Sequence, residues 1–274
     1  MLKDLTKAAK AIIPSSLVKA IVPQSVRLAR HVRLVLEGSV SDPEVALLPL
    51  LAGTGCFLDV GANLGSWTGP ASRVFKRVHA FEPYAELAAA LRAVAPPNVT
   101  VHDVALSDCA GIARFAVPLH RGEHLTSRAS LDANANDGFE QVIRHVTMAR
   151  LDSLELRGVN AIKIDVEGHE EATLEGAWVT IERERPTLII EIEERHHAGR
   201  SELIIERIVS RGYQCCYLSE GRIERFEAGE VARLQPVDST PARLEKAAGY
   251  INNFIFVPNE RDALLDAMQR HLEE

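Results

Sequence analysis

The amino-acid sequence predicts an α/β fold with one doubly wound, mostly parallel sheet and a helical N-terminal extension. From residue 56 onward, short apolar runs alternate with segments of helical periodicity, a pattern typical of parallel strands with helices on both faces. A glycine-rich turn follows the first of these runs, at the place where such sheets bind ligands. The length of 274 residues suits one large domain. We expect the extension over residues 1–50 and the main domain over residues 51–274.

The extension is expected to be helical because its apolar residues keep helical spacing. Between Pro23 and Gly38 they recur every three or four positions, which favours an amphipathic helix. A second short helix is predicted to begin after Asp42, a favourable cap followed by Pro43 in the first helical position, and to end before Gly53.

The main domain is predicted to alternate strands and helices. The expected strands are Cys56–Val60, Arg77–Phe81, Val99–Asp103, Gly111–Val117, His145–Ala149, Ala161–Val166, Pro186–Glu193, Tyr213–Leu218 and Tyr250–Val257. The expected helices are Ser66–Phe75, Tyr84–Val94, Glu170–Glu184, Ser201–Arg211 and a C-terminal helix from Glu260. The strand over 111–117 fits an antiparallel neighbour. The segment His120–Gly138 is predicted to be a loop, and loops of this length are typical of functional regions.

Composition and charge place the chain among ordinary globular proteins. Hydrophobic residues make up 46% and charged residues 25% of the sequence. The net charge is −7, but residues 1–36 carry seven basic side chains and one acidic side chain. The acidic remainder argues against a nucleic acid as the main partner, because such binding neutralises phosphates. The basic segment is expected either to pack on the domain, as a lid or as the arm of a homo-oligomer, or to contact an anionic membrane surface.

The cysteine content and the lack of long apolar runs indicate the cellular compartment in which the protein is expected. Four cysteines without a C-x-x-C pair are too sparse for a disulfide framework. No apolar run reaches the length of a membrane span, and Pro14 and Pro23 interrupt the apolar stretches of the N-terminus, unlike a secretory signal. We expect a cytoplasmic protein, either free or attached peripherally to the inner face of the membrane.

The glycine-rich turn runs from Asp59 to Gly65 with the sequence DVGANLG. Gly61 and Gly65 permit positive φ angles and close approach to a ligand. A dinucleotide fingerprint would need G-x-G-x-x-G, whereas Asn63 stands at its second glycine and Ser66 at its third. Asp59 would repel a phosphate but suits a cationic amine. The turn therefore favours S-adenosylmethionine, which carries an ammonium and a sulfonium, over a dinucleotide.

An acidic residue ends the second predicted strand. Glu82 lies twenty-one residues after Gly61, and an acid at this place accepts hydrogen bonds from ribose hydroxyls in nucleoside-binding βαβ units. The alternative interpretation is a tight turn and an exposed glutamate without function. The combination of turn and acid favours the cofactor site.

The sequence resembles the FkbM family of S-adenosylmethionine-dependent methyltransferases. The resemblance rests on the segments FLDVGANLGSWT, VHAFEP, VTVHDVALSD, ARLDSL, IKIDVEGHEEATLEGA, PTLIIEIE and NNFIFVP, in this order. It covers residues 56–257, apart from 120–140 and 219–245. It implies a class I, Rossmann-like methyltransferase sheet and methyl transfer, usually to a hydroxyl of a sugar or natural product. The cofactor residues that it implies are Asp59, Gly61, Ala62, Asn63 and Gly65 at the methionine end, Glu82 at the ribose, and Asp103 and Ala105 near the adenine.

A hydroxyl acceptor needs a base or a metal ion to help remove its proton. On a strand over 161–166, Lys163, Asp165 and Glu167 would share one face at the carboxyl end. Asp165 and Glu167 are therefore catalytic candidates, whereas Lys163 fits an ion pair with Asp165 or Glu191 equally well. His169 is a third catalytic candidate because an unperturbed histidine titrates near pH 6.5. It could equally cap the next helix or face water.

Carboxylates at two neighbouring strand ends also suit a Mg²⁺ ion. The predicted ligands are Asp165 and Glu191, joined by Glu193 or His196. The pair His196–His197 is otherwise typical of loop polarity. Trp67 is expected either to pack on the cofactor or to lie in the core, and Trp178 to lie in the core.

Three other classes of function stay open at the level of sequence. A metal hydrolase would use the carboxylates of Asp165 and Glu191, but it would leave the glycine turn and Glu82 unexplained. An NAD-dependent sugar oxidoreductase would bind NAD in place of S-adenosylmethionine, although its fingerprint is missing. A non-catalytic subunit with the same fold would bind the cofactor without transferring a methyl group. The acceptor, a small molecule or a glycan, is not identified; residues 120–140 and 219–245 are expected to shape its pocket.

Overall fold

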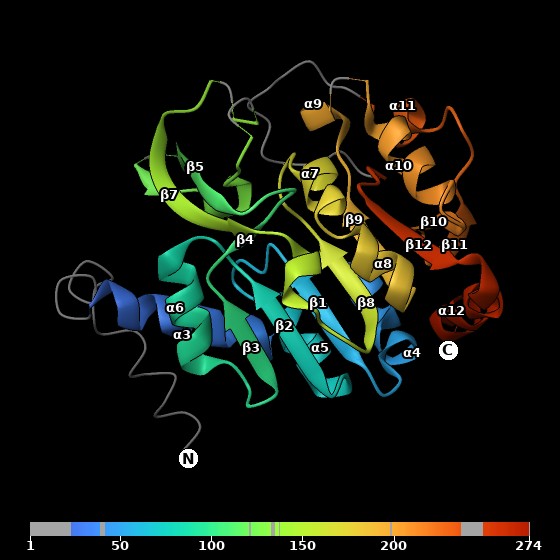
Figure 1. The fold of residues 1–274 in the computed structure, drawn as a ribbon, viewed down its shortest axis with the longest axis horizontal. Coiled ribbons are helices and arrows are strands. Elements are labelled where there is room, and N and C mark those ends of the chain that lie inside the picture. The colour runs from blue at the N-terminus through green and yellow to red at the C-terminus, as the bar shows by residue number, and fades with distance from the viewer. Residues whose placement is uncertain are drawn as a thin grey trace, which may run out of the picture.

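A computed structural model describes residues 23–38, 42–120, 122–132, 135–136, 138–197, 199–236 and 249–273. Its centre is an eight-stranded sheet in the order β11-β10-β12-β9-β8-β1-β2-β3 (Figure 1). The strands are β1 (Cys56–Val60), β2 (Arg77–Phe81), β3 (Val99–His102), β8 (Val159–Ile164), β9 (Thr187–Glu191), β10 (Tyr213–Ser219), β11 (Arg222–Arg225) and β12 (Asn253–Pro258). Neighbours from β3 to β9 are parallel, and β12, β10 and β11 add antiparallel pairs. The prediction of a mostly parallel sheet is confirmed.

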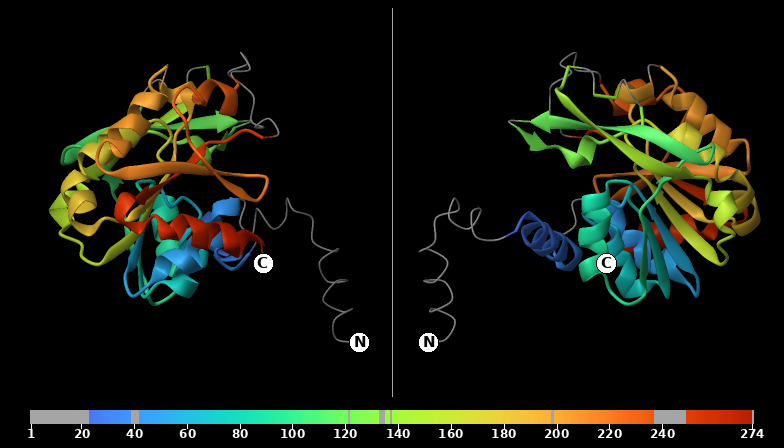
Figure 2. Two further views of the ribbon diagram at one scale, coloured as in Figure 1. Left: turned by 90° about the vertical axis from the view of Figure 1, so that its right-hand side faces the viewer. Right: turned by 60° about the vertical axis from the view of Figure 1, so that its left-hand side comes forward.

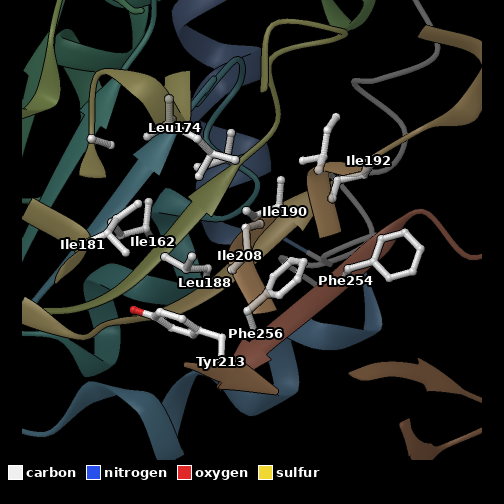
Figure 3. Close-up of a cluster of buried hydrophobic side chains, with 14 of the residues drawn as sticks. Ile162, Leu174, Ile181, Leu188, Ile190, Ile192, Ile208, Tyr213, Phe254 and Phe256 are labelled. Carbon is white, nitrogen blue, oxygen red and sulfur yellow. The ribbon is translucent and has the colours of Figure 1, made fainter. Parts of the chain in front are cut away.

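Helices cover both faces of this sheet, because its central strands are apolar on both sides. One face packs on α7 (Glu170–Glu175), α8 (Trp178–Glu184), α10 (Ser201–Val209) and α11 (Val231–Leu234). The other face packs on α4 (Leu48–Ala52), α5 (Thr68–Val74), α6 (Ala85–Val94) and α12 (Ala263–Glu273). Figure 2 shows the two helical layers from the sides. Figure 3 shows the first core, which includes Ile162, Leu188 and Phe254 of the strands and Leu174 and Ile181 of the helices.

A second, four-stranded sheet, which the sequence does not predict, lies between β3 and β8 in the chain. Its order is β4-β7-β5-β6, formed by β4 (Ala105–Leu106), β5 (Gly111–His120), β6 (Glu123–His124) and β7 (Gln141–Ala149). The pairing of β5 with β7 is antiparallel, as predicted for residues 111–117. Its buried residues Phe115 and Val117 pack on Tyr84 and Leu87. This hairpin takes the place of a crossover helix and is the green ribbon at the upper left of Figure 1.

Two elements near the predicted site differ from expectation. The strand predicted over 161–166 ends at Ile164, so Asp165 and Glu167 do not extend a strand face shared with Lys163. The chain turns there because Glu167 and Gly168 take positive φ angles of 50° and 97°. The helix predicted over 170–184 is broken between α7 and α8.

The N-terminal region packs closely against the main domain. It comprises α3 (Gln24–Glu37), a 3₁₀ helix (Pro43–Leu47) and α4. Val32 and Leu36 of α3 are buried against α6. The helix α4 runs across residue 50, so secondary structure does not mark the boundary predicted there. Residues 1–22, with most of the basic side chains of the extension, lie outside the described residues.

Candidate cofactor and acceptor site

The glycine-rich turn follows β1 and contacts the segment after β8. Gly61, Asn63 and Gly65 have φ angles of 83°, 46° and 87°, as the sequence predicts for a turn of this composition. A Cβ atom on Gly61 would lie 1.8 Å from the backbone carbonyl oxygen of Asp165. Residue 61 must be glycine because this close approach brings the turn and Asp165 into direct contact.

Glu82 closes the turn from the end of β2. Its carboxylate accepts hydrogen bonds from the backbone N–H groups of Asn63 and Tyr84, both at 2.7 Å. Burial raises the pKa of Glu82 to about 7, and the nearby charges of Asp59 and Asp103 add to the rise. With 4% of its surface exposed, Glu82 is not the exposed glutamate of the alternative interpretation.

Asp59 lies beneath the turn. It is 2% exposed and accepts a hydrogen bond from the hydroxyl of Thr68. Burial raises the pKa of Asp59 to about 6, although this hydrogen bond and the charge of Lys163 oppose the rise. The structure therefore places its negative charge below the turn, on the Lys163 side.

Lys163 is completely buried beside Asp59. Its ammonium donates to the carbonyl oxygen of Ile164 at 3.1 Å and lies 3.9 Å from Oδ2 of Asp165. The ion pair with Asp165 that the sequence predicts as an alternative is confirmed. The ring of Trp67 lies 5.6 Å from the ammonium, and Trp67 is itself buried in the core, with Nε1 donating to Asp42.

Three carboxylates meet at the carboxyl ends of β8 and β9. Asp165, Glu167 and Glu191 each offer an oxygen atom within 4.8 Å of the others; we call them the carboxylate cluster. Asp165 and Glu191 lie together as predicted because parallel neighbouring strands end at the same edge of the sheet. Glu167, predicted as a catalytic group, joins them. Glu193 instead accepts hydrogen bonds from Arg195 and from Asn252.

The histidines after β9 have buried side chains that contact glutamates, so their interpretation as loop polarity is wrong. They lie in the short helix α9 (Glu194–His197). Nε2 of His196 is 3.0 Å from Oε2 of Glu167, and Nε2 of His197 is 2.8 Å from Oε2 of Glu170. Sequence spacing could not reveal these pairs because their partners are almost thirty residues apart.

His169 points to the second sheet. It precedes α7, and its Nε2 atom lies 2.9 Å from the hydroxyl of Ser107. Burial lowers the pKa of His169. Of the predicted adenine residues beside Ser107, Asp103 is exposed after β3 and Ala105 is buried in β4. The three catalytic candidates are thus divided, with Asp165 and Glu167 in the cluster and His169 on Ser107.

The segment after β6 bridges the two parts of the site. His124 lies 2.7 Å from the hydroxyl of Tyr84, and the hydroxyl of Thr126 donates to the side chain of Asn63 at 3.4 Å. The hydroxyl of Ser130 donates to the carbonyl oxygen of Glu167 at 2.6 Å. The segment 124–130, within the predicted functional loop, therefore contacts both the turn and the residues after β8.

Comparison with known proteins identifies a family. The family described as "Methyltransferase FkbM domain" matches residues 59–215, more than half of the chain. No curated protein matches the sequence significantly.

Similar solved structures include methyltransferases from two bacteria. Methyltransferase FkbM from Methylobacillus flagellatus KT is 16% identical with a TM-score of 0.44, and the match covers 87% of this chain and 59% of that one. Precorrin-6y C5,15-methyltransferase from Geobacter metallireducens GS-15 is 14% identical with a TM-score of 0.38, covering 79% of this chain and 88% of that one. The chain thus spans less than two thirds of the first of these structures.

Proposed function

Because the chain belongs to the FkbM family of S-adenosylmethionine-dependent methyltransferases, we propose that it methylates a hydroxyl oxygen of a sugar, glycan or other natural product. The observation that carries this proposal is the carboxylate cluster beside the glycine-rich turn. It offers proton acceptors next to the place where a methyl group would be delivered. A hydroxyl is a poor nucleophile until its proton is removed, so methyl transfer to an oxygen atom benefits from nearby proton acceptors.

The residues around the turn fit the cofactor. When bound, S-adenosylmethionine supplies an electrophilic methyl group on a positive sulfur. Glu82 is a buried carboxylate with a raised pKa, and hydroxyl donors of a ribose would stabilise its charged form. The charge of Asp59 beneath the turn favours a cationic methionine end. We propose that Gly61, Ala62, Asn63 and Gly65 line this end, and that Asp103 and Ala105 adjoin the adenine.

The carboxylate cluster would remove the acceptor proton, either directly or through a divalent cation. The three carboxylates of the cluster lie among cations: Lys163 is beside Asp165, and Arg195 and Arg128 are near Glu167. The all-oxygen character of the cluster would suit Mg²⁺. Asp165 and Glu191 would be its ligands.

His169 is the alternative base. Its lowered pKa keeps it neutral at physiological pH, so it could accept a proton. Its contact with Ser107 would first have to break. We therefore favour the carboxylates Asp165 and Glu167 as the groups that act on the acceptor.

The exposed side of α3 supports a proposal about location. Arg30 and Arg33 are exposed there together with Val26 and Leu34, which are 55% and 59% exposed. We propose that residues 1–36 hold a cytoplasmic enzyme at an anionic membrane surface, close to lipid-linked acceptors. The described part of the chain contains no helix with the length and apolarity of a membrane span. Flotation with anionic liposomes should carry the intact chain and lose a version without residues 1–22, which keeps the buried Val32 and Leu36; equal flotation would refute the proposal.

A labelled-methyl assay tests the reaction itself. The protein would be incubated with methyl-labelled S-adenosylmethionine and with glycolipid, polysaccharide or small-molecule extracts, in Mg²⁺ or in EDTA. We expect label in an alkali-stable ether of one extract. Unchanged turnover in EDTA would refute the metal route and leave the carboxylates as direct bases. Thermal-shift measurements with S-adenosylmethionine and NAD serve as a control, since an oxidoreductase would respond to NAD.

A further inference from the structure

Two segments far apart in the sequence face each other beside the carboxylate cluster. Residues 167–171 follow β8 and begin α7, and residues 195–200 include most of α9. Successive acidic side chains of the first segment pair with successive basic side chains of the second. The pairs are Glu167 with Arg195 and His196 at 3.0 Å each, Glu170 with His197 at 2.8 Å, and Glu171 with Arg200 at 2.6 Å. We call this arrangement the ion-pair ladder.

Glu167, at one end of the ladder, has a strained backbone. Its φ angle of 50° lies in the left-handed region, which is rare for a residue other than glycine. Such a conformation costs on the order of 1 kcal/mol or more and persists where the surroundings enforce it. The hydroxyl of Ser130 holds its carbonyl oxygen, and the N–H of Gly168 donates to Glu170 at 3.1 Å. The backbone of Glu167 is therefore fixed from two sides.

The side chain of Glu167 is fixed as well. Arg195 and His196 both contact the same oxygen, Oε2. The imidazole of His196 has 4% of its surface exposed, and a Cβ atom on Gly168 would lie 3.2 Å from the Cβ of His196. Gly168 thus leaves room for His196, and two donors from α9 set the orientation of the carboxylate.

We infer that Arg195 and His196 are positioning residues that hold the carboxylate of Glu167 in the cluster with Asp165 and Glu191. The inference rests on the proposed function, because it assumes that the cluster acts on the acceptor. Partners in the shell around a metal or a catalytic carboxylate commonly change affinity or activity by about 10–100-fold when they are removed. The short helix α9 would thereby assemble the acceptor side of the site.

A double-mutant cycle between Glu167 and His196 tests the inference. The rate of methyl transfer would be measured for the wild type, Glu167→Gln, His196→Ala and the double variant, with the extract that the wild type methylates. We expect His196→Ala to slow transfer about tenfold. If His196 acts through Glu167, adding His196→Ala to Glu167→Gln should cost little more, because coupled residues are not additive.

Matched variants separate positioning from general stability. Arg200→Gln removes the exposed end of the same ladder without touching Glu167, so it should leave the rate unchanged. His196→Gln keeps a side-chain N–H donor and should restore part of the rate lost in His196→Ala. Arg195→Gln should slow transfer as His196→Ala does. The dissociation constant for S-adenosylmethionine should stay unchanged in all of these variants.

Terbium luminescence gives a second readout that needs no acceptor. Tb³⁺ would serve as the probe of the cluster, excited through the nearby Trp67, and its lifetimes in H₂O and D₂O count the coordinated waters. Because Glu167 offers an oxygen atom within 4.8 Å of those of Asp165 and Glu191, it can act as a third ligand of the probe ion, and its loss exposes about one more position to water. We expect this increase in Glu167→Gln and in His196→Ala, with no further increase in the double variant.

The outcomes distinguish this inference from the proposed function. Additive rate effects, or an equal loss of rate in Arg200→Gln, overturn the inference while the methyltransferase assignment stands. If Glu167→Gln transfers methyl at the full rate, the role proposed for this member of the cluster is wrong, and positioning of Glu167 falls with it. If no extract is methylated, the numbers of coordinated waters around Tb³⁺ in the wild type and the variants test whether His196 acts through Glu167. A wild type that neither methylates nor binds Tb³⁺ overturns both.

Discussion

The proposed cofactor side and the proposed acceptor side of the site are held together by different groups. On the cofactor side, the carboxylate of Glu82 is held by backbone N–H groups of Asn63 and Tyr84. On the acceptor side, the carboxylate of Glu167 is held by the side chains of Arg195 and His196. A backbone N–H donor remains when its side chain is substituted, whereas a side-chain donor is removed by one substitution.

This difference predicts two kinds of response to mutation. Substitutions that shift the turn should reduce stability together with cofactor binding. Substitutions on the acceptor side should change the rate of methyl transfer and leave the fold and the cofactor affinity almost intact.

The largest effect is expected from Gly61→Ala, because Gly61 joins the two sides. The new methyl group would lie 1.8 Å from the carbonyl oxygen of Asp165, and the φ angle of 83° is unfavourable for alanine. The backbone of Asp165 cannot move aside as the end of a flexible side chain can, so the clash cannot be relieved locally. We expect the free energy of unfolding to fall by about 3–5 kcal/mol, measured by urea denaturation.

Gly221→Ala is the matched control for this prediction. Gly221 has a φ angle of 79°, and nothing lies within 4 Å of the position that a Cβ atom would take there. Only the backbone conformation should matter at this residue, at a cost of about 1 kcal/mol. Equal losses of stability at Gly61 and Gly221 would show that the contact with Asp165 contributes nothing.

Asp165→Asn should affect the rate of methyl transfer without affecting the affinity for the cofactor. The amide keeps the volume of the carboxylate but loses its charge and its ability to take a proton. We expect methyl transfer to slow by about a hundredfold, with the dissociation constant for S-adenosylmethionine unchanged in calorimetry. Glu171→Gln, a similar change in the exposed part of the ladder, should keep the full rate. A weakened cofactor affinity in Asp165→Asn would show that Asp165 belongs to the cofactor side.

Glu82→Gln is the corresponding change on the cofactor side. Glutamine has one oxygen where two N–H donors need an acceptor, so the variant loses a hydrogen bond of the turn as well as the proposed ribose contact. We expect the dissociation constant for S-adenosylmethionine to rise about tenfold, in line with the loss of one hydrogen bond to a charged group. An unchanged constant would remove Glu82 from the cofactor site.

The free energy of unfolding of the wild type, compared with that of Glu82→Gln, should also depend on pH. Burial raises the pKa of Glu82 from 4.5 to about 7, so the folded state binds its proton more tightly than the unfolded state. The resulting stabilisation is complete below pH 4.5 and is lost as the pH rises to about 7. The stability of the wild type relative to Glu82→Gln should therefore decline across this range in urea denaturation. A constant difference would mean that Glu82 titrates normally.

The cofactor side could be predicted from the sequence because its parts are close in the chain. Asp59, Gly61 and Gly65 stand in one turn, and Glu82 follows after one helix and one strand. Glycine at positive φ and an acid at a strand end are local requirements, so the residue types reveal them. The structure confirms the expected φ angles and adds the burial of Asp59.

The acceptor side could be predicted only in part. The meeting of Asp165 and Glu191 follows from parallel neighbouring strands, a property of topology. The pairing of Glu167 with His196 depends on side-chain packing across 29 residues, which no spacing rule describes. The second sheet escaped prediction for a similar reason, since a hairpin such as β5–β7 can pair by itself or extend the main sheet with the same strand pattern.

The smallest effect is expected from His169→Gln, which tests where the boundary between the two sides runs. His169 contacts Ser107, which directly follows β4, and its lowered pKa follows from burial; a neutral amide donor and acceptor could replace it in this contact. We expect methyl transfer to change less than about threefold, well below the loss expected for a general base. Ser107→Ala should behave in the same way, because it removes only the other half of this contact. A loss near a hundredfold in His169→Gln, with Asp165→Asn nearly fully active, would transfer the role of base from the carboxylate cluster to His169 and place the acceptor beside the second sheet.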